Sequence, residues 1–163
     1  MSLSNNAASF TKNLKDVLQD IVNSLNGIHA VTIIDTDGLL IEEINLEGSL
    51  GKESSLILCS LVAGINANMV TIGREIGSSP WVSLTSESEN FKFFIRAAGE
   101  IAFLGVLTDP YVDMELLKLV IGPGVNLILQ ILQQQQYPKS RPLFSLSTLR
   151  ISQGEIDTIL DMS

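Results

Sequence analysis

The sequence has little of what disulfides, metal sites and nucleophilic active sites are built from. Its 163 residues include one cysteine, Cys59, and one histidine, His29, so an internal disulfide or a site of several histidines cannot form. We therefore expect no metal, no cofactor and a reducing compartment, the cytoplasm. Cys59 lies in an apolar run without a second cysteine nearby, which indicates packing rather than catalysis.

Basic residues are also scarce. Ten Lys and Arg stand against 18 Asp and Glu, which gives a net charge of −8 at pH 7. Nucleic-acid binding draws much of its affinity from clustered cations, so nucleic acid is not an expected partner. Charged residues make up 17% of the chain while 45% is hydrophobic, a balance that favours burial of surface by association. We expect an oligomer that acts through protein partners.

Two stretches resemble a phosphate-binding loop and a membrane span, but each lacks a required feature. Residues 48–54 resemble a phosphate-binding loop, but Leu46 stands where that motif needs glycine and Glu53 where it needs serine or threonine. Residues 56–73 carry no charge over the length of a membrane span, yet polar residues such as Asn66 and Asn68 would lack partners in hydrocarbon. We expect neither nucleotide binding nor integral membrane insertion.

The hydrophobic spacing predicts an α/β (α+β) domain of order α-β-β-α-β-β-β-α. Helical periodicity covers residues 10–25, 53–76 and 113–132, with a kink expected at Gly122-Pro123-Gly124. Short runs of β-formers predict strands at 30–34, 39–44, 81–85, 91–97 and 101–107. Asp35 to Gly38 should join the first two strands as a hairpin. The fourth strand alternates, which predicts Phe94 on its more open face, and the fifth is apolar throughout and should lie centrally.

The two ends differ from this central part. Residues 1–10 are polar and predict a flexible tail without a signal peptide, and residues 11–136 predict one domain. Residues 137–163 predict a C-terminal extension. There, residues 152–155 have the spacing of a capping box, and Ile156, Ile159 and Leu160 form the stripe of a short amphipathic helix.

The second predicted helix has two contrasting faces. At about 100° per residue, one face collects the large apolar residues that should pack on the sheet: Leu58, Leu61, Val62, Ile65, Met69, Ile72 and Ile76. The opposite face collects Ser60, Ala63, Gly64, Ala67, Thr71 and Arg74. A solvated face would normally carry Lys and Glu, and small residues let another backbone approach closely. We therefore interpret this second face as a contact surface.

These features together resemble the roadblock/light-chain-7 family. The resemblance rests on the element order, the Asp-Gly hairpin and Leu61-Val62-Ala63-Gly64, and it spans roughly Leu14 to Leu132. It is greatest for the bacterial MglB-like branch, because Leu143-Phe144-Ser145-Leu146 and an acidic, apolar end follow the third helix. The resemblance implies a three-layer α/β/α fold, with a five-stranded antiparallel sheet between the second helix and the other two.

The resemblance also implies a function. Such proteins form homodimers through their second helices and the edge of the third strand, here Trp81, Val82 and Ser83. They bind a Ras-like small GTPase (MglA-like) and promote its GTP hydrolysis without supplying a catalytic residue. The stripe at 156–160 is implied as a second contact with the GTPase, with an effect on nucleotide exchange. Two alternatives stay open: a scaffold or light-chain-type subunit that ignores nucleotide state, and a small-molecule sensor.

Overall fold

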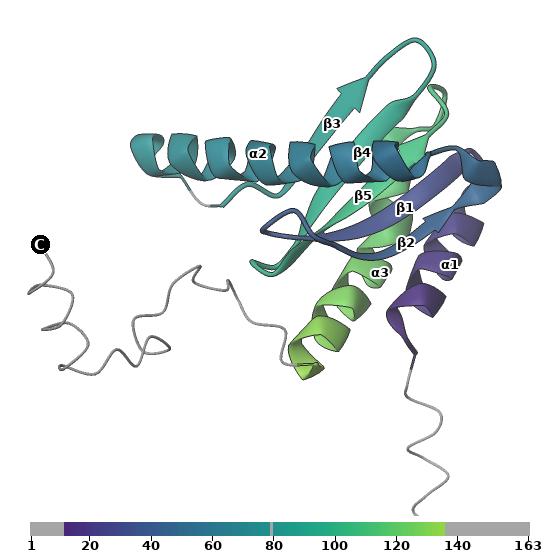
Figure 1. Cartoon of the computed structure of the whole chain (residues 1–163), viewed down its shortest axis with the longest axis horizontal. Helices are drawn as coiled ribbons and strands as arrows, with labels where there is room; N and C mark the ends of the chain where they lie inside the picture. Colours follow the sequence, from purple (N-terminus) through teal and green to yellow (C-terminus); the bar gives the residue numbers. More distant parts are fainter. Residues whose placement is uncertain (1–11, 79, 136–163) are drawn as a thin grey trace, which may run out of the picture.

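The computed structural model describes residues 12–78 and 80–135, which form three layers (Figure 1). The elements are α1 (Leu14–Ser24), β1 (Ile28–Asp35), β2 (Leu40–Asn45), the short 3-10 helix η2 (Leu46–Gly48), α2 (Lys52–Ile76), β3 (Ser83–Glu87), β4 (Lys92–Ala98), β5 (Ala102–Thr108) and α3 (Met114–Gln134). The predicted order of helices and strands is confirmed. The predicted tails, including Ile156, Ile159 and Leu160, lie outside the described residues.

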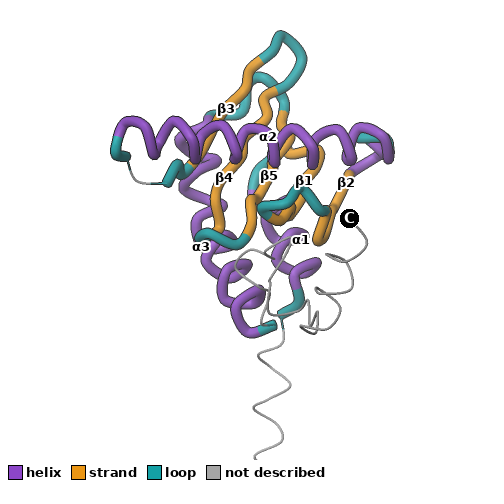
Figure 2. Tube along the Cα trace, turned by 60° about the vertical axis from the view of Figure 1, so that its left-hand side comes forward, coloured by secondary structure: helices purple, strands orange, loops and turns teal. Residues whose placement is uncertain are grey.

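The five strands form one antiparallel sheet in the order β2-β1-β5-β4-β3. β5 is central, as its apolar sequence predicts, and all its residues except Leu107 are buried. β2 and β3 are the two edges, and β3 is the more exposed. Figures 1 and 2 show α2 across one face of the sheet and α1 and α3 on the other. Each face therefore has its own helical cover.

Local hydrogen bonds set where the elements begin and turn. Asn13 and Asp16 form a capping box, so α1 begins at Leu14 rather than near residue 10. Asp35 Oδ1 accepts from the backbone N–H groups of Asp37 and Leu39, each at 2.9 Å, which closes the turn between β1 and β2. The predicted hairpin is thus confirmed.

The larger core lies between the sheet and the pair α1 and α3. Phe94 was expected on the open face of β4, and that expectation is wrong, because its side chain is 0% exposed within this core. The alternation along β4 reflects two covered faces rather than one. α3 runs unbroken through Pro123, and Gly124 lies so close to α1 that a Cβ there would be 2.9 Å from Ile21 Cδ1. The small residue thus permits close packing of the two helices.

The core under α2 is smaller, and it consists of Ile34, Cys59, Val62, Phe93, Ile95 and Phe103. Three residues predicted to face the sheet from α2 do not: Leu61, Ile72 and Ile76 are 49%, 51% and 71% exposed. The buried residues of α2 are instead Ser55, Cys59 and Val62, so the side that meets the sheet differs from the large apolar face chosen by periodicity. Figure 1 shows the C-terminal end of α2 extending beyond the strands, in agreement with the high exposure of Ile76.

Candidate functional site

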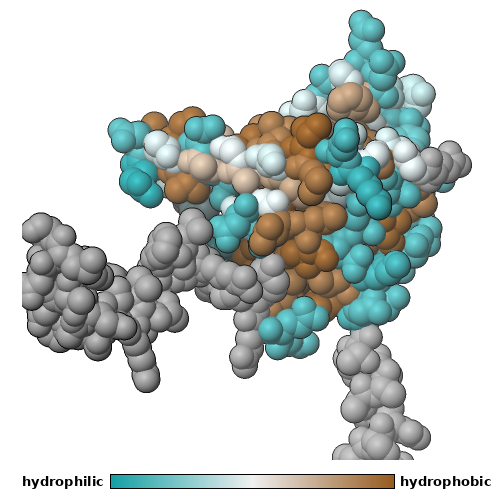
Figure 3. Space-filling model, in the orientation of Figure 1, coloured by the Kyte–Doolittle hydropathy of each residue, from teal (hydrophilic) through white to brown (hydrophobic). Residues whose placement is uncertain are grey.

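The outer side of α2 exposes more large apolar side chains than is usual for a helix face in contact with solvent. α2 and α3 are both long and apolar enough to cross a membrane, judged by length and composition alone. Each instead packs on a face of the sheet. In the most apolar stretch of each helix, 11% of the residues of α2 are buried, against 28% of those of α3. Figure 3 shows neutral and apolar colours along most of the visible side of α2. This side of α2 is therefore the first candidate for a contact with another protein.

Two neighbouring stripes divide this exposed side. The apolar stripe consists of Ile57, Leu61 and Ile72, which are 67%, 49% and 51% exposed. The small-residue stripe consists of Ser60, Gly64, Ala67 and Thr71, all of them exposed. Its members recur at helical spacing, one position before the apolar stripe, so the two stripes run side by side. Open space surrounds Gly64, where an added Cβ would meet no atom within 4 Å.

The predicted contact residues of α2 are therefore mostly brought together. Arg74 is exposed at the C-terminal end of the helix. Ala63 differs from the others because it is half-buried against the β1–β2 turn, where a Cβ on Gly38 would lie 2.9 Å from the Ala63 Cβ. Ala63 thus helps to seat α2 on its own domain.

A groove of about 430 Å³ links the apolar stripe to the open edge of the sheet. Its lining is mostly apolar and includes Ile57 and Leu61 from α2, Phe91 before β4, and Ser86 from the edge strand β3. Phe91 is 43% exposed. The interpretation of the sequence missed this groove, although the absence of charge all round α2 from residue 56 to 73 was its signal.

The edge strand β3 begins two residues later than predicted. The Trp81 ring stacks on Phe103 with centroids 5.0 Å apart, and its Nε1–H donates to Asn66 Oδ1 at 3.0 Å. These contacts turn the indole under α2, so Trp81 is not an edge residue. Val82, which is 58% exposed, and the exposed Ser83 remain as candidates at the edge.

Beneath α2, the thiol of Cys59 is held in its protonated form. Burial is the main cause that raises the pKa of Cys59, and the nearby carboxylates of Glu43 and Asp35 raise it further. Glu43 is itself engaged, since Ser55 Oγ donates to its Oε1 at 2.7 Å. A protonated, buried thiol is a poor nucleophile, in agreement with the packing role expected from the sequence.

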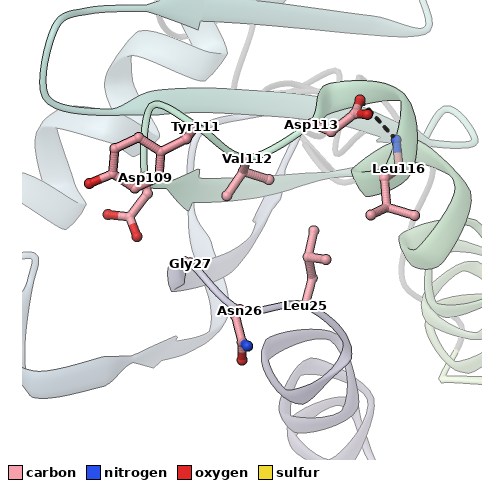
Figure 4. Close-up of a pocket in the computed structure, with 8 residues that line it drawn as sticks. All are labelled: Leu25, Asn26, Gly27, Asp109, Tyr111, Val112, Asp113 and Leu116. Carbon is pink, nitrogen blue, oxygen red and sulfur yellow. Dashed lines mark hydrogen bonds between the residues drawn. The ribbon is translucent and has the colours of Figure 1, made fainter.

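A separate hollow of about 460 Å³ lies where the loop before β1 meets the loop before α3. Figure 4 shows Asp109 and Tyr111 near one another, with Asp113 at the start of α3. Asp109 Oδ1 pairs with His29 Nε2 at 2.6 Å, and the Asp113 carboxylate caps α3. Both carboxylates in this hollow therefore already serve the fold. Among residues 12–78 and 80–135, no group of three or more His, Cys, Asp or Glu is placed to hold a metal ion.

Comparison with known families agrees with this arrangement. The model of the Roadblock/LC7 domain matches residues 14–108, more than half of the chain. The chain belongs to the Roadblock/LC7 family. No curated protein matches it in sequence.

Solved structures show the same Roadblock/LC7 fold. Myxococcus xanthus MglB superimposes with a TM-score of 0.67 at 22% identity, over 77% of this chain and 98% of that one. The gliding protein MglB from Thermus thermophilus gives 0.66 at 18% identity, over 74% and 89%. A Roadblock/LC7 domain from Streptomyces avermitilis gives 0.64 at 18% identity, over 72% and 95%. The predicted α/β/α fold with a five-stranded antiparallel sheet is confirmed.

Proposed function

We propose that this chain is a homodimeric regulator of a Ras-like small GTPase that promotes GTP hydrolysis without an active site of its own. The observation that carries the proposal is the exposed side of α2, with its apolar stripe next to an open strand edge and its small-residue stripe beside it. Membership of the Roadblock/LC7 family and the fold shared with MglB proteins support it.

The apolar stripe is the better surface for a second copy of the chain. Ile57 and Leu61 adjoin the groove that reaches β3, so one partner can cover the stripe and pair with the strand edge together. Burial of large apolar side chains and of an unpaired edge is typical of permanent interfaces. We assign the homodimer contact to this stripe, with Val82 and Ser83 at the strand edge.

The small-residue stripe then remains for the GTPase. This stripe has only short, weakly polar side chains, so a partner's backbone can approach it closely; its members are Ser60, Gly64, Ala67 and Thr71. A regulator of this kind acts by binding one nucleotide state of the GTPase better than the other. Such a regulator does not have to insert a catalytic side chain into the GTPase. Arg74 lies at the end of the small-residue stripe and is a further contact candidate.

GTP hydrolysis tests the proposal directly. The cognate Ras-like protein, loaded with GTP, is followed with and without a molar excess of this chain. Acceleration of hydrolysis supports the regulator. Binding that is equal for the GTP and GDP forms, without acceleration, would instead favour the scaffold alternative.

Substitutions in the two stripes separate assembly from GTPase binding. The double variant Leu61→Glu and Ile72→Glu should be monomeric in analytical ultracentrifugation, because it places charge in the apolar stripe. Gly64→Arg should remain dimeric but lose GTPase binding, since it adds bulk to the small-residue stripe. Leu119→Glu is the matched control, because Leu119 is 74% exposed on α3, away from both stripes. A monomeric Gly64→Arg variant would show that our assignment of the stripes is wrong.

A further inference from the structure

A second groove, of about 240 Å³, lies on the other side of α2 from the apolar stripe. Its lining includes Asn66 and Val70 from α2, Trp81 before β3, and Gly99 and Glu100 from the turn between β4 and β5. Val70 is 45% exposed and Trp81 is half-buried. The proposed dimer and GTPase contacts do not use this groove, so it stays open to a different occupant.

Leu129, in the last turns of α3, lies beside one wall of this groove. Gly99, in its wall, adjoins α3 so tightly that a Cβ there would be 2.8 Å from Leu129 Cδ1. From Leu129 to Gln135 the helix rises about 9 Å. From Gln135 to residue 143 an extended chain can span about 26 Å. The chain that follows α3 is therefore long enough to return to the groove.

The chemistry of that following segment complements the groove. Residues 136–151 contain Lys139, Arg141 and Arg150 and no acidic residue, whereas residues 12–135 hold 15 of the 18 acidic residues and seven of the ten basic ones. Glu100 is exposed in the groove wall, and the exposed Asp37 follows Thr36, which also lines it. Arg74, one turn beyond Val70, adds one positive charge there, against the two negative charges of Glu100 and Asp37.

The sequence of the segment also suits an extended, partly apolar ligand. Pro138 and Pro142 disfavour a helix, and Leu143-Phe144 places two large apolar side chains directly after the cations. In the groove, the half-buried Trp81 ring and the exposed Val70 offer an apolar surface. An aromatic ring against an indole is a favourable contact beyond the area that it buries.

We propose that residues 138–144 dock in this groove of their own chain, with Phe144 against Trp81 and Val70, and Lys139 and Arg141 facing Glu100. The docked segment strengthens the attachment of the second half of α2 to the sheet, which otherwise depends on few buried residues. The contact lies within one chain and does not depend on the proposed GTPase regulation.

Trp81 is the only tryptophan of the chain, so its fluorescence reports on the groove. In the full chain, Leu143→Ser with Phe144→Ser should shift the Trp81 emission to the red and increase quenching by acrylamide, because the indole loses its cover. Ile159→Ser with Leu160→Ser is the matched control, because it also replaces two adjacent large apolar side chains but outside the docking segment, and it should leave both readouts unchanged. Equal spectra for the wild type and the first variant would overturn the proposal.

Charge and concentration provide the second test. Lys139→Glu with Arg141→Glu should also expose Trp81, and added salt should weaken the protection in the wild type. A hundredfold dilution should leave the wild-type quenching constant unchanged, because the docking is intramolecular. Protection that disappears on dilution would assign the groove to the tail of another copy. Protection that changes with neither salt nor the charge reversal would show that Lys139 and Arg141 do not face Glu100, which would overturn the proposed placement of the segment.

Discussion

On one face of the sheet, α1 and α3 seal a continuous core that includes the fully buried Phe94, Leu104 and Leu117. On the other face, α2 lies across the strands with three of its residues buried and large apolar side chains left in solvent. Both helical layers are rich in apolar residues, so composition does not distinguish them. The difference lies in how much of each helix its own sheet can cover.

The comparison separates stability from association. A helix whose apolar residues are covered within its own chain contributes to folding, whereas uncovered apolar residues contribute once a second surface meets them. We therefore expect substitutions on the α1 and α3 face to change the free energy of unfolding, and substitutions on the exposed side of α2 to change assembly instead.

Truncation of a buried leucine should separate the faces most clearly. Leu117 is 0% exposed in α3, so Leu117→Ala should lower the free energy of unfolding by about 2–5 kcal/mol. Leu61→Ala on α2 removes the same atoms from a half-exposed position and should cost less than about 1 kcal/mol of concentration-independent stability. Urea unfolding at several protein concentrations measures both. Equal losses that do not depend on concentration would contradict the division between the faces.

Adding one methyl group to a glycine should have opposite effects in the two layers. Gly124→Ala places a Cβ 2.9 Å from Ile21 Cδ1, and such overpacking typically costs about 1–3 kcal/mol. Gly64→Ala meets open space and should stabilise the helix by up to about 1 kcal/mol. Thermal or urea unfolding gives the sign of each change. Stabilisation by Gly124→Ala would show that α1 and α3 adjust more readily than their close packing suggests.

The hydrogen bond that attaches α2 to Trp81 should have a smaller effect. Asn66→Ala removes the acceptor of the Trp81 Nε1–H and should lower the free energy of unfolding by about 0.5–1.5 kcal/mol. Asn68→Ala is the matched control, because Asn68 is exposed on the same helix and should change stability by less than about 0.5 kcal/mol. If both variants lose the same stability, Trp81 is held chiefly by its stacking on Phe103.

The smallest effect concerns the pH dependence of the single thiol. Because burial, then Glu43 and Asp35, raise the pKa of Cys59, the folded chain keeps the thiol protonated at a pH where the unfolded chain ionises it. Stability should therefore fall as pH rises through the unfolded thiol pKa of about 8.5. Cys59→Ala should flatten that decline. Cys59 should react slowly with a thiol reagent at pH 8, and it should react faster in the Glu43→Gln variant. Equal rates in the two proteins would show that the Glu43 carboxylate does not raise the pKa of Cys59.

Much of the fold was predictable because its signals are local. The hairpin at Asp35 to Gly38, the central strand at 101–107 and the capping residue Asp113 depend on neighbouring residues, and the structure confirms all three. Phe94 was misplaced because alternation along one strand cannot show whether a second helical layer exists. The exposure of Leu61 and Ile72 was missed because apolar periodicity does not show which side of a helix with so few charges meets the sheet, and the buried residues Cys59 and Val62 lie on a different side.

The candidate site was predicted in part. The small residues of α2 could be grouped from helical spacing alone, and all but the half-buried Ala63 are exposed. The groove beside Leu61 and Phe91 joins residues 30 positions apart in the sequence, and no local pattern connects them. Trp81 was assigned to the strand edge because the sequence does not show that Asn66 lies opposite its indole.

By itself, the sequence determined the type and order of the three helices and five strands, the turn at Asp35 to Gly38, the cap Asp113 and the small, uncharged residues of α2, because these depend on backbone conformation and on periodicity over a few residues. Only the tertiary structure decided which apolar side chains of α2 stay in solvent and that the Trp81 indole packs under α2 against Phe103 and Asn66. Those properties depend on how far each helix extends over the sheet, and that distance is set by packing between residues far apart in the chain.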